Sequence, residues 1–411
     1  MTRDNKQVAI GTGLLILLAL ITALDAMAID MYLPGMPDIA EDLNVSAGHI
    51  QQTLAVFLIG LAVGQAIYGP LLDRFGRRWP LLIGLCVFIA GSILAALAHS
   101  FETLIAARFL QALGASAGLV APRAIIDDVH ELKESAQKLS VLMQVMMVAP
   151  IVAPVLGGLI LIYAEWHMIF WAMAALALIT LIWGLVSVPD TLAHEQRVAL
   201  SAASIVKGYA RLLKQPVFML YSVAGGLVLG AFFSYISGSS FVFMEHFELG
   251  STQYSQLFAA NSVGLVVGGA VSNALIKRGW STFRVMMAGT MIYTLAGAVL
   301  WGVNTLIATT LVTYGLILGL AIASLGMVFG NVMALTMNAA DSPAGVASAL
   351  MGVLQYLLSA VVGFVVSLTV ISPGQLPATI ALCGALALVL CWHASRKEQS
   401  VAYPAGAAES A

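Results

Sequence analysis

Charge is the scarcest feature of this sequence. Only 9% of its 411 residues are charged, and 60% are hydrophobic, whereas about a quarter of the residues in a typical soluble domain are charged. Such a chain cannot cover itself with a water-soluble surface, but it suits a protein whose outer surface is lipid. The net charge of −2 also argues against a polyanionic partner, so we expect no nucleic-acid partner.

Cysteines and catalytic patterns are scarce as well. The three cysteines, Cys86, Cys383 and Cys391, lie in apolar runs, and their odd number indicates packing residues rather than a disulfide framework or a metal site. The histidines lie near the ends of apolar runs or between them and form no metal-spaced pair. No phosphate loop occurs, and no stretch has the strand-to-helix context that a nucleophile elbow requires. We therefore expect no enzyme activity, no cofactor and no resident metal.

What the sequence does contain is long apolar runs. A run of about 20 apolar residues is long enough to cross a bilayer as a helix. Twelve such runs occur, at about 8–33, 50–72, 79–99, 103–126, 137–162, 166–188, 217–243, 252–275, 283–303, 306–331, 345–371 and 376–394. The first is too long, and too interrupted by aspartate, for a cleaved signal peptide. The sequence therefore predicts an all-α membrane protein with twelve transmembrane helices.

The longest connection, 189–216, follows the sixth run and divides the chain into two six-helix halves. The predicted organisation is an N-terminal half (1–188), a central loop (189–216), a C-terminal half (217–395) and a tail (396–411). A membrane receptor would be expected to carry a signalling domain, and no connection here is long enough to hold one. Membrane-embedded enzymes and receptors are therefore both disfavoured.

The two halves also repeat a loop pattern. Gly69 and Asp73 precede a basic pair after the second run, and about 200 residues later Gly269 and Asn273 precede another basic pair after the eighth run. Two halves with matching loops are typical of a transporter that binds its substrate between repeats.

The positive charges lie almost entirely on one side of a twelve-helix arrangement. Of the 18 lysines and arginines, 17 fall before the first run, in or at the edges of alternate connections, or after the last run: Arg3, Lys6, Arg74, Arg77, Arg78, Arg123, Lys133, Lys138, Arg197, Lys207, Arg211, Lys214, Lys277, Arg278, Arg284, Arg396 and Lys397. The opposite connections carry acids and no lysine or arginine. By the positive-inside rule, both termini are expected in the cytoplasm.

Four stretches carry a family resemblance. GPLLDRFGRRWPLL (69–82) resembles the loop signature of the major facilitator superfamily, and RFLQALGAS (108–116) resembles its fourth-helix motif. APIVAPVLGG (149–158) resembles the fifth-helix motif of its antiporters, and IDMYLPGMP (29–37) resembles the first helix of Bcr/CflA-type (bicyclomycin/chloramphenicol/florfenicol) drug–proton antiporters. Thr22 stands where some of these relatives carry an acid.

The resemblance implies the major facilitator fold and a proton-coupled transporter in the inner membrane of a bacterium. It would export small amphipathic molecules, including antibiotics, by alternating access. The alternative within the same family is a proton-coupled carrier of a natural metabolite such as a nucleoside or sugar. Its partners would be the small-molecule substrate, protons and the lipid bilayer, and it would act as a monomer. Export and import are not distinguished by the sequence.

Two aspartates and one arginine interrupt the apolar runs: Asp25, Asp30 and Arg108. A carboxylate in hydrocarbon costs a few kcal/mol. At about 1.5 Å per residue, Asp30, Arg108 and Asp25 lie about 6, 10 and 14 Å deep. The two acids are roughly 140° apart around their helix, so they do not share a narrow stripe.

Because two carboxylates share a single arginine, one of the two carboxylates can readily take up a proton. Burial raises the pKa of a carboxyl group and a nearby arginine lowers it, so a change of partner can move that pKa across the physiological range. We therefore expect Asp25, Asp30 and Arg108 to handle the coupling proton. The alternative is a static ion pair that holds the first and fourth helices together.

Substrate contacts are expected from polar, aromatic and methionine side chains, which make adaptable pockets. The candidates are Tyr32, Gln111, Met143, Gln144, Met147, Tyr235, Phe241 and Gln355. For each one alone, helix packing is the competing interpretation.

The loop after the second run is interpreted as a conformational latch outside the substrate cavity. The latch residues are Gly69, Asp73, Arg77 and Arg78 around this loop, together with Asp127 after the fourth run. Arg77 could pair with Asp127 or Asp128, and Asp73 could lie at the helix N-terminus near 341–345, where a helix dipole favours negative charge.

Overall fold

The computed structural model describes residues 11–129, 132–192, 202–307, 309–342, 344–369 and 372–402. Arg3, Lys6, Arg197 and the tail from 403 onward, which enter the predictions above, lie outside these ranges. Within the described residues there is no β-strand. Twelve helices there are long and apolar enough to cross a membrane, which confirms the predicted twelve spans. In lipid, such a chain must satisfy its backbone polar groups internally, and a helix does so within one segment.

The chain forms two compact units. The helices of the first are α1 (Thr12–Asp30), η1 (Leu33–Gly35), α2 (Met36–Asp42), α3 (Ala47–Phe75), α4 (Arg78–Ala96), α5 (Phe101–Val129), α6 (Leu132–Tyr163) and α7 (His167–Ser187). Those of the second are α8 (Ala202–Leu213), α9 (Pro216–Phe241), the π-helical turn Val242–His246, α10 (Ser251–Lys277), α11 (Thr282–Leu306), α12 (Leu311–Leu325), α13 (Phe329–Asn338), α14 (Ala344–Ser367) and α15 (Gln375–Ala402). Gly250–Ala259, which comprises the residue before α10 and the start of that helix, groups with the first unit.

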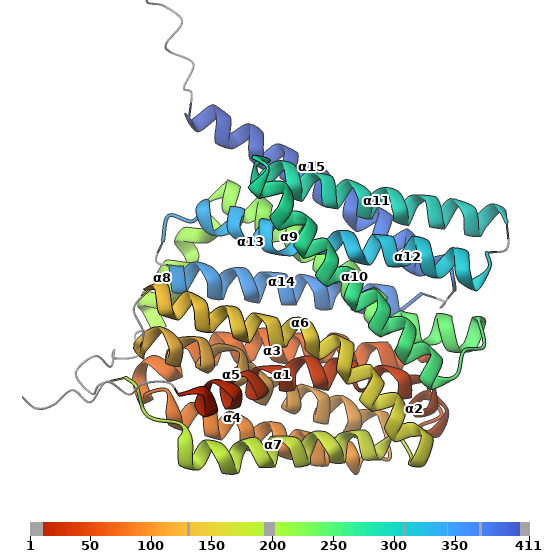
Figure 1. The fold of residues 1–411 in the computed structure, drawn as a ribbon, viewed down its shortest axis with the longest axis horizontal. Coiled ribbons are helices and arrows are strands. Elements are labelled where there is room, and N and C mark those ends of the chain that lie inside the picture. The colour runs from red at the N-terminus through yellow and green to blue at the C-terminus, as the bar shows by residue number, and fades with distance from the viewer. Residues whose placement is uncertain are drawn as a thin grey trace, which may run out of the picture. The chain divides into compact units, whose positions relative to one another are not determined.

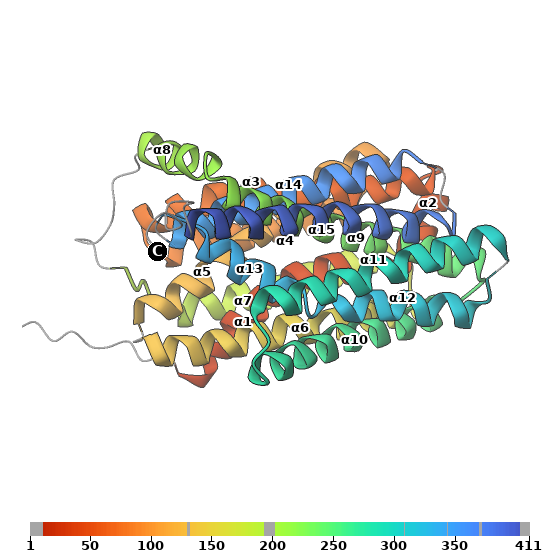
Figure 2. The ribbon, with the colours of Figure 1, turned by 90° about the horizontal axis from the view of Figure 1, so that it is seen from above.

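In the first unit, α5 packs against α1, α3, α4 and α6 (Figures 1 and 2). Small residues allow these helices to approach closely, as is common in membranes. A Cβ atom at Gly91 of α4 would collide with the backbone of Gln111 in α5, and one at Gly118 of α5 would lie 2.8 Å from the carbonyl oxygen of Ile21 in α1. A Cβ at Gly157 of α6 would likewise collide with the carbonyl oxygen of Met31. These contacts fix α1 between α5 and α6.

The first span is not one uninterrupted α-helix. α1 stops at Asp30, and Leu33, Pro34 and Gly35 form a turn of 3₁₀-helix before α2. Proline lacks a backbone N–H and cannot continue an α-helical hydrogen-bond ladder from its interior. Asp42 at the end of α2 accepts a hydrogen bond from the indole of Trp166 at 3.1 Å. The short α2 is thereby tied to the start of α7.

In the second unit, α9 packs against α14 and α15, and α15 packs against α11. The predicted tenth span, 306–331, is not one continuous helix but α12 and α13, and the helix extends to Asn338. The break has a packing cause: a Cβ at Gly326 would collide with the backbone of Leu265 and Gly269 in α10. At the break, Asn331 donates to the Met327 carbonyl at 2.8 Å and so satisfies a freed acceptor.

Candidate functional site

Arg108 is the centre of the polar site inside the first unit. It lies on α5 and is completely buried. Its Nη1 donates to the carbonyl oxygen of Ala28 in α1 at 2.9 Å and to Oε1 of Gln111 at 2.5 Å. Neither Asp25 nor Asp30 forms an ion pair with it within 4.0 Å in the described part of the chain. The static ion pair considered above is therefore not formed in this structure.

The two acids of α1 are both buried, at 6% and 3% exposed for Asp25 and Asp30. Asp25 is within electrostatic reach of Arg108 and Arg123, both on α5, while the charge that acts on Asp30 is that of Asp25. Oδ1 of Asp25 is buried without a hydrogen-bond partner. Asp25 is therefore the acid whose charge interacts with the arginines of α5, and Asp30, five residues further on, lies about 140° away around the helix.

A pocket of about 400 Å³ lies along α1 and α6. Its lining is Ala23, Met27, Val141, Gln144, Val145, Val148, Ala149, Val152 and Ala153. Asp30 follows Met27 by three residues and Ala23 by seven, spacings that keep all three on one helix face. The pocket wall is thus apolar apart from one amide, and the face of α1 that lines it continues to a buried carboxylate.

The expected substrate residues fall into different surroundings. Tyr32 and Gln111 lie against Arg108, and Gln144 alone of the candidates lines the pocket. Met143 and Met147 are 40% and 38% exposed on α6 and do not line it. In the second unit, the Tyr235 hydroxyl accepts a hydrogen bond from Asn261 at 3.0 Å, and Phe241 is buried. Gln355 of α14 lies against Gly225 of α9.

Gln111 links Arg108 to two further helices. Its Nε2 donates to Oγ of Ser92 in α4 at 2.9 Å and to the sulfur of Met173 in α7 at 3.7 Å. Nearby, Thr22 donates to the Gly118 carbonyl at 3.1 Å. This threonine, which stands where some relatives carry an acid, serves here in the packing of α1 against α5.

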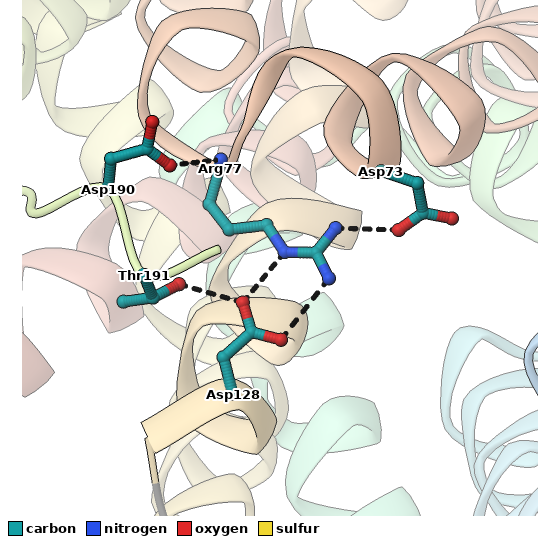
Figure 3. Close-up of polar contacts among 5 residues, drawn as sticks. All are labelled: Asp73, Arg77, Asp128, Asp190 and Thr191. Carbon is teal, nitrogen blue, oxygen red and sulfur yellow. Dashed lines mark hydrogen bonds and ion pairs between the residues drawn. The ribbon is translucent and has the colours of Figure 1, made fainter. Parts of the chain in front are cut away.

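A second polar network surrounds Arg77, between α3 and α4 (Figure 3). Arg77 donates from Nε and Nη2 to the two carboxylate oxygens of Asp128, at 2.8 and 3.2 Å, and from Nη1 to Asp73 at 2.7 Å. Its backbone N–H donates to Asp190 at 3.0 Å, and Thr191 donates to Asp128 at 2.7 Å. Burial lowers the pKa of Arg77, but the hydrogen bonds to Asp128 and Asp73 outweigh it, and that pKa is raised.

The other latch residues lie at the edge of this network. Of the two acids offered as partners, Asp128 binds Arg77, while Asp127 accepts a hydrogen bond from Ser135. Arg78 donates to the Leu185 carbonyl at 2.6 Å. A Cβ at Gly69 would meet no atom within 4 Å. The network therefore joins α3, α5 and the segment after α7 within one unit.

The sequence matches the model of the Major Facilitator Superfamily over residues 18–364. The chain belongs to the Major Facilitator Superfamily. The members of this superfamily found as its relatives are transporters rather than enzymes, and this chain is a multi-pass membrane transporter of small molecules.

Its relatives agree with the resemblance to Bcr/CflA-type proteins. The chain is 36% identical to the uncharacterized MFS-type transporter YdgK of Bacillus subtilis (strain 168), over 91% of its own length and 94% of that protein's. It is 30% identical to the multidrug resistance protein MdtL of Escherichia coli (strain K12), over 80% and 81% of the two chains. It is 28% identical to the bicyclomycin resistance protein homolog of Haemophilus influenzae, over 85% and 87%.

Solved structures share the superfamily fold. A D-xylose–proton symporter matches with a TM-score of 0.74 at 14% identity, covering 92% of this chain and 97% of that one. The nucleoside transporter NupG matches with a TM-score of 0.73 at 15% identity, covering 93% and 99%.

Sequence reasoning missed three kinds of residue in these sites. Phe57 and Phe170, which flank Arg108, sit in apolar runs and carry no signal that separates them from packing residues. Met27 lines the pocket only because of its helix phase. Asp190 and Thr191 lie in the connection after α7, where proximity to Arg77 depends on the fold.

Proposed function

We propose that this superfamily member is a proton-coupled antiporter that exports small amphipathic molecules, antibiotics included, from the bacterial cytoplasm by alternating access. It would sit as a monomer in the inner membrane with both termini in the cytoplasm. The two six-helix halves, 1–188 and 217–395, would be its moving bodies. The relatives named for bicyclomycin and multidrug resistance support this assignment.

The observation that carries the proposal is the pair of buried carboxylates on the helix that lines the pocket. Asp25 and Asp30 are almost fully buried and unpaired with Arg108. A carboxyl group in such a place readily holds a proton, since desolvation disfavours its charged form. Protonation from the periplasm and release to the cytoplasm would couple the proton gradient to a change of conformation.

The pocket supports an amphipathic substrate. Gln144 is its one amide, and the remaining lining side chains are apolar. A sugar or nucleoside needs several hydrogen-bond partners, since each buried hydroxyl left unpaired costs free energy. The metabolite carrier is therefore the second candidate, and its solved relatives share the fold alone.

The Arg77 network supports a separate role in controlling conformation. It lies between helix ends, and Asp73 at its rim is 59% exposed. We infer that Asp73→Asn slows transport while leaving substrate affinity within a few-fold, because its carboxylate binds Arg77 rather than substrate. A large loss of affinity in the purified variant would contradict this role.

Inverted membrane vesicles test the main proposal. The vesicles are energised to an acidic interior, and chloramphenicol, bicyclomycin, a nucleoside and a sugar are added in turn while a pH-sensitive dye is read. An antiporter exporting antibiotics releases protons from the vesicle interior on addition of the antibiotics and not of the sugar or nucleoside. Asp30→Asn vesicles serve as the uncoupled control. Proton movement only with a nucleoside or sugar would favour the metabolite carrier.

A further inference from the structure

Arg108 is a buried cation without a carboxylate partner. Its exposed fraction is 0%, and only Nη1 forms hydrogen bonds, with a carbonyl and an amide oxygen. Nε and Nη2 are buried without a partner. Taking a charge out of water costs several kcal/mol unless something replaces the water. Two neutral acceptors on one nitrogen do not account for a stable unpaired guanidinium.

Three aromatic rings supply the missing stabilisation. The guanidinium carbon of Arg108 lies 4.4 Å from the ring centroid of Phe57, 4.8 Å from that of Tyr32 and 5.9 Å from that of Phe170. Each distance is within the roughly 6 Å over which a ring face attracts a cation, and the attraction is stronger when the pair is desolvated. We call these three rings the aromatic cage. They come from α3, from the corner after α1 and from α7.

The cage is itself held in place. Tyr32 and Phe170 lie with ring centroids 5.7 Å apart, and the Tyr32 hydroxyl pairs with Oγ1 of Thr53 at 3.0 Å. Phe57 and Phe170 are both completely buried. Trp166 packs edge-on against Phe170 at 6.0 Å. The rings therefore cannot leave the guanidinium without a rearrangement of three helices.

We propose that Phe57, Tyr32 and Phe170 are positioning residues that hold Arg108 as an unpaired cation and thereby leave the Asp25 carboxyl free to take a proton. The inference rests on the proposed function, because it concerns the proton that drives transport. It concerns a different step, however: the cage acts on proton binding, which is measured without substrate.

The charged surroundings of Asp25 give the direction of the effect. From α5 it faces Arg108 and Arg123, and on its own helix the nearest acid is Asp30. On the packed helices α6 and α7, charged or titratable residues within the described ranges stand only near the helix ends: Lys133, Glu134, Lys138 and Tyr163 on α6 and His167 on α7. Without the aromatic cage, the Asp25 carboxylate is the most favourable partner for Nε and Nη2 of Arg108, the two nitrogens that have no hydrogen bond. A carboxylate paired with arginine holds a proton less tightly.

Infrared difference spectroscopy of the purified full-length protein measures this proton directly. A protonated carboxyl group has its own C=O stretching band, and the Asp25→Asn variant identifies which band belongs to Asp25. The band is followed as pH is raised in four proteins: wild type, Phe57→Leu, Phe57→Tyr and Phe88→Leu. Phe88 is the matched control, because it is a completely buried phenylalanine of the same unit, on α4, and is not among the three rings that lie over the guanidinium.

In Phe57→Leu we expect the Asp25 band to titrate at lower pH, with proton binding weakened about tenfold. Phe57→Tyr keeps a ring face and should restore the wild-type midpoint, and Phe88→Leu should keep that midpoint while losing similar stability. If Phe57→Leu does not fold, Phe170→Leu takes its place, with a smaller shift because that ring is farther away. An unchanged or higher midpoint in the leucine variant would overturn the proposal, and so would a wild-type protein with no Asp25 band.

The infrared titration and the vesicle assay test the cage and the proposed function separately. If the vesicles show no proton movement with antibiotics but the Asp25 band shifts in Phe57→Leu, the proposed function fails and the cage stands. If the vesicles show coupled export and the band does not shift, the cage fails and the function stands.

Discussion

Asp128 holds the guanidinium of Arg77 through both carboxylate oxygens, at 2.8 and 3.2 Å. This two-point geometry fixes the plane of the guanidinium as well as its position. Arg77 is 10% and Asp128 18% exposed, so water screens the pair only partly. The neighbouring Asp127 has a different partner, Ser135. The end of α5 therefore presents two adjacent acids with separate roles.

Asp128→Asn should destabilise the protein more than Asp127→Asn. The first change removes the carboxylate charge that pairs with Arg77 and should lower the free energy of unfolding by about 2 kcal/mol. The second removes only the acceptor for Ser135. Thermal unfolding in detergent, followed by tryptophan fluorescence, compares the two variants. Equal losses in melting temperature would show that the Arg77–Asp128 contact adds nothing specific.

Gly76→Ala should cost more stability than Gly69→Ala. Gly76 ends α3 with φ at +87°, and a Cβ there would collide with the Asp190 carboxylate that binds the Arg77 backbone. Residues that carry a Cβ atom rarely adopt a backbone conformation with positive φ. We therefore expect Gly76→Ala to lower the free energy of unfolding by about 1–3 kcal/mol. A Cβ at Gly69 meets nothing within 4 Å, so its alanine variant should be neutral.

The same unfolding assay reads both glycine variants. Transport by Gly76→Ala should fall in proportion to the amount of folded protein in the membrane. A Gly76→Ala protein as stable as wild type would mean that the turn after α3 relaxes without cost.

Asp30→Asn should abolish transport driven by a pH gradient. Asp25→Asn should also reduce transport, and more for a cationic substrate such as ethidium than for neutral chloramphenicol, because a negative charge is lost from the site. The two variants are compared by uptake into energised inverted vesicles with expression levels matched. Full gradient-driven transport by Asp30→Asn would remove this residue from the coupling step.

The topology of the chain can be tested by reporter fusions. A phosphatase, which is active only outside the cytoplasm, should be inactive when fused after Arg396 and active near Glu248. The reason is the one-sided distribution of lysine and arginine in the sequence, which orients membrane helices. An active fusion after Arg396 would place the C-terminus outside and contradict an even number of spans.

Much of the fold follows from local pattern. The twelve spans were predictable, because each apolar run is long enough to cross lipid and each connection is polar. The break between α12 and α13 was not, because it depends on Gly326 meeting Gly269 of another helix. No local pattern marks that contact, and the segment between Leu311 and Asn338 is apolar throughout most of its length.

The sites divide in the same way. Asp25, Asp30 and Arg108 were conspicuous as charges in apolar runs. Their depth in the membrane alone, however, did not predict which of them form ion pairs. Arg108 lies at the depth of the acids and yet points into aromatic rings. The choice between Asp127 and Asp128 for Arg77 likewise depends on helix phase, in which neighbouring residues differ by about 100°.

An amide at position 111, rather than a carboxylate, has an electrical consequence. Gln111 binds Arg108 at 2.5 Å without neutralising it, so Arg108, Asp25 and Asp30 together carry +1, 0 or −1 as two, one or no proton is bound. A membrane potential acts on a unit charge with about 2.3 kcal/mol per 100 mV across the full bilayer. The state with one proton therefore crosses between conformations without sensing voltage at these three groups, while the states on either side of it are driven in opposite directions.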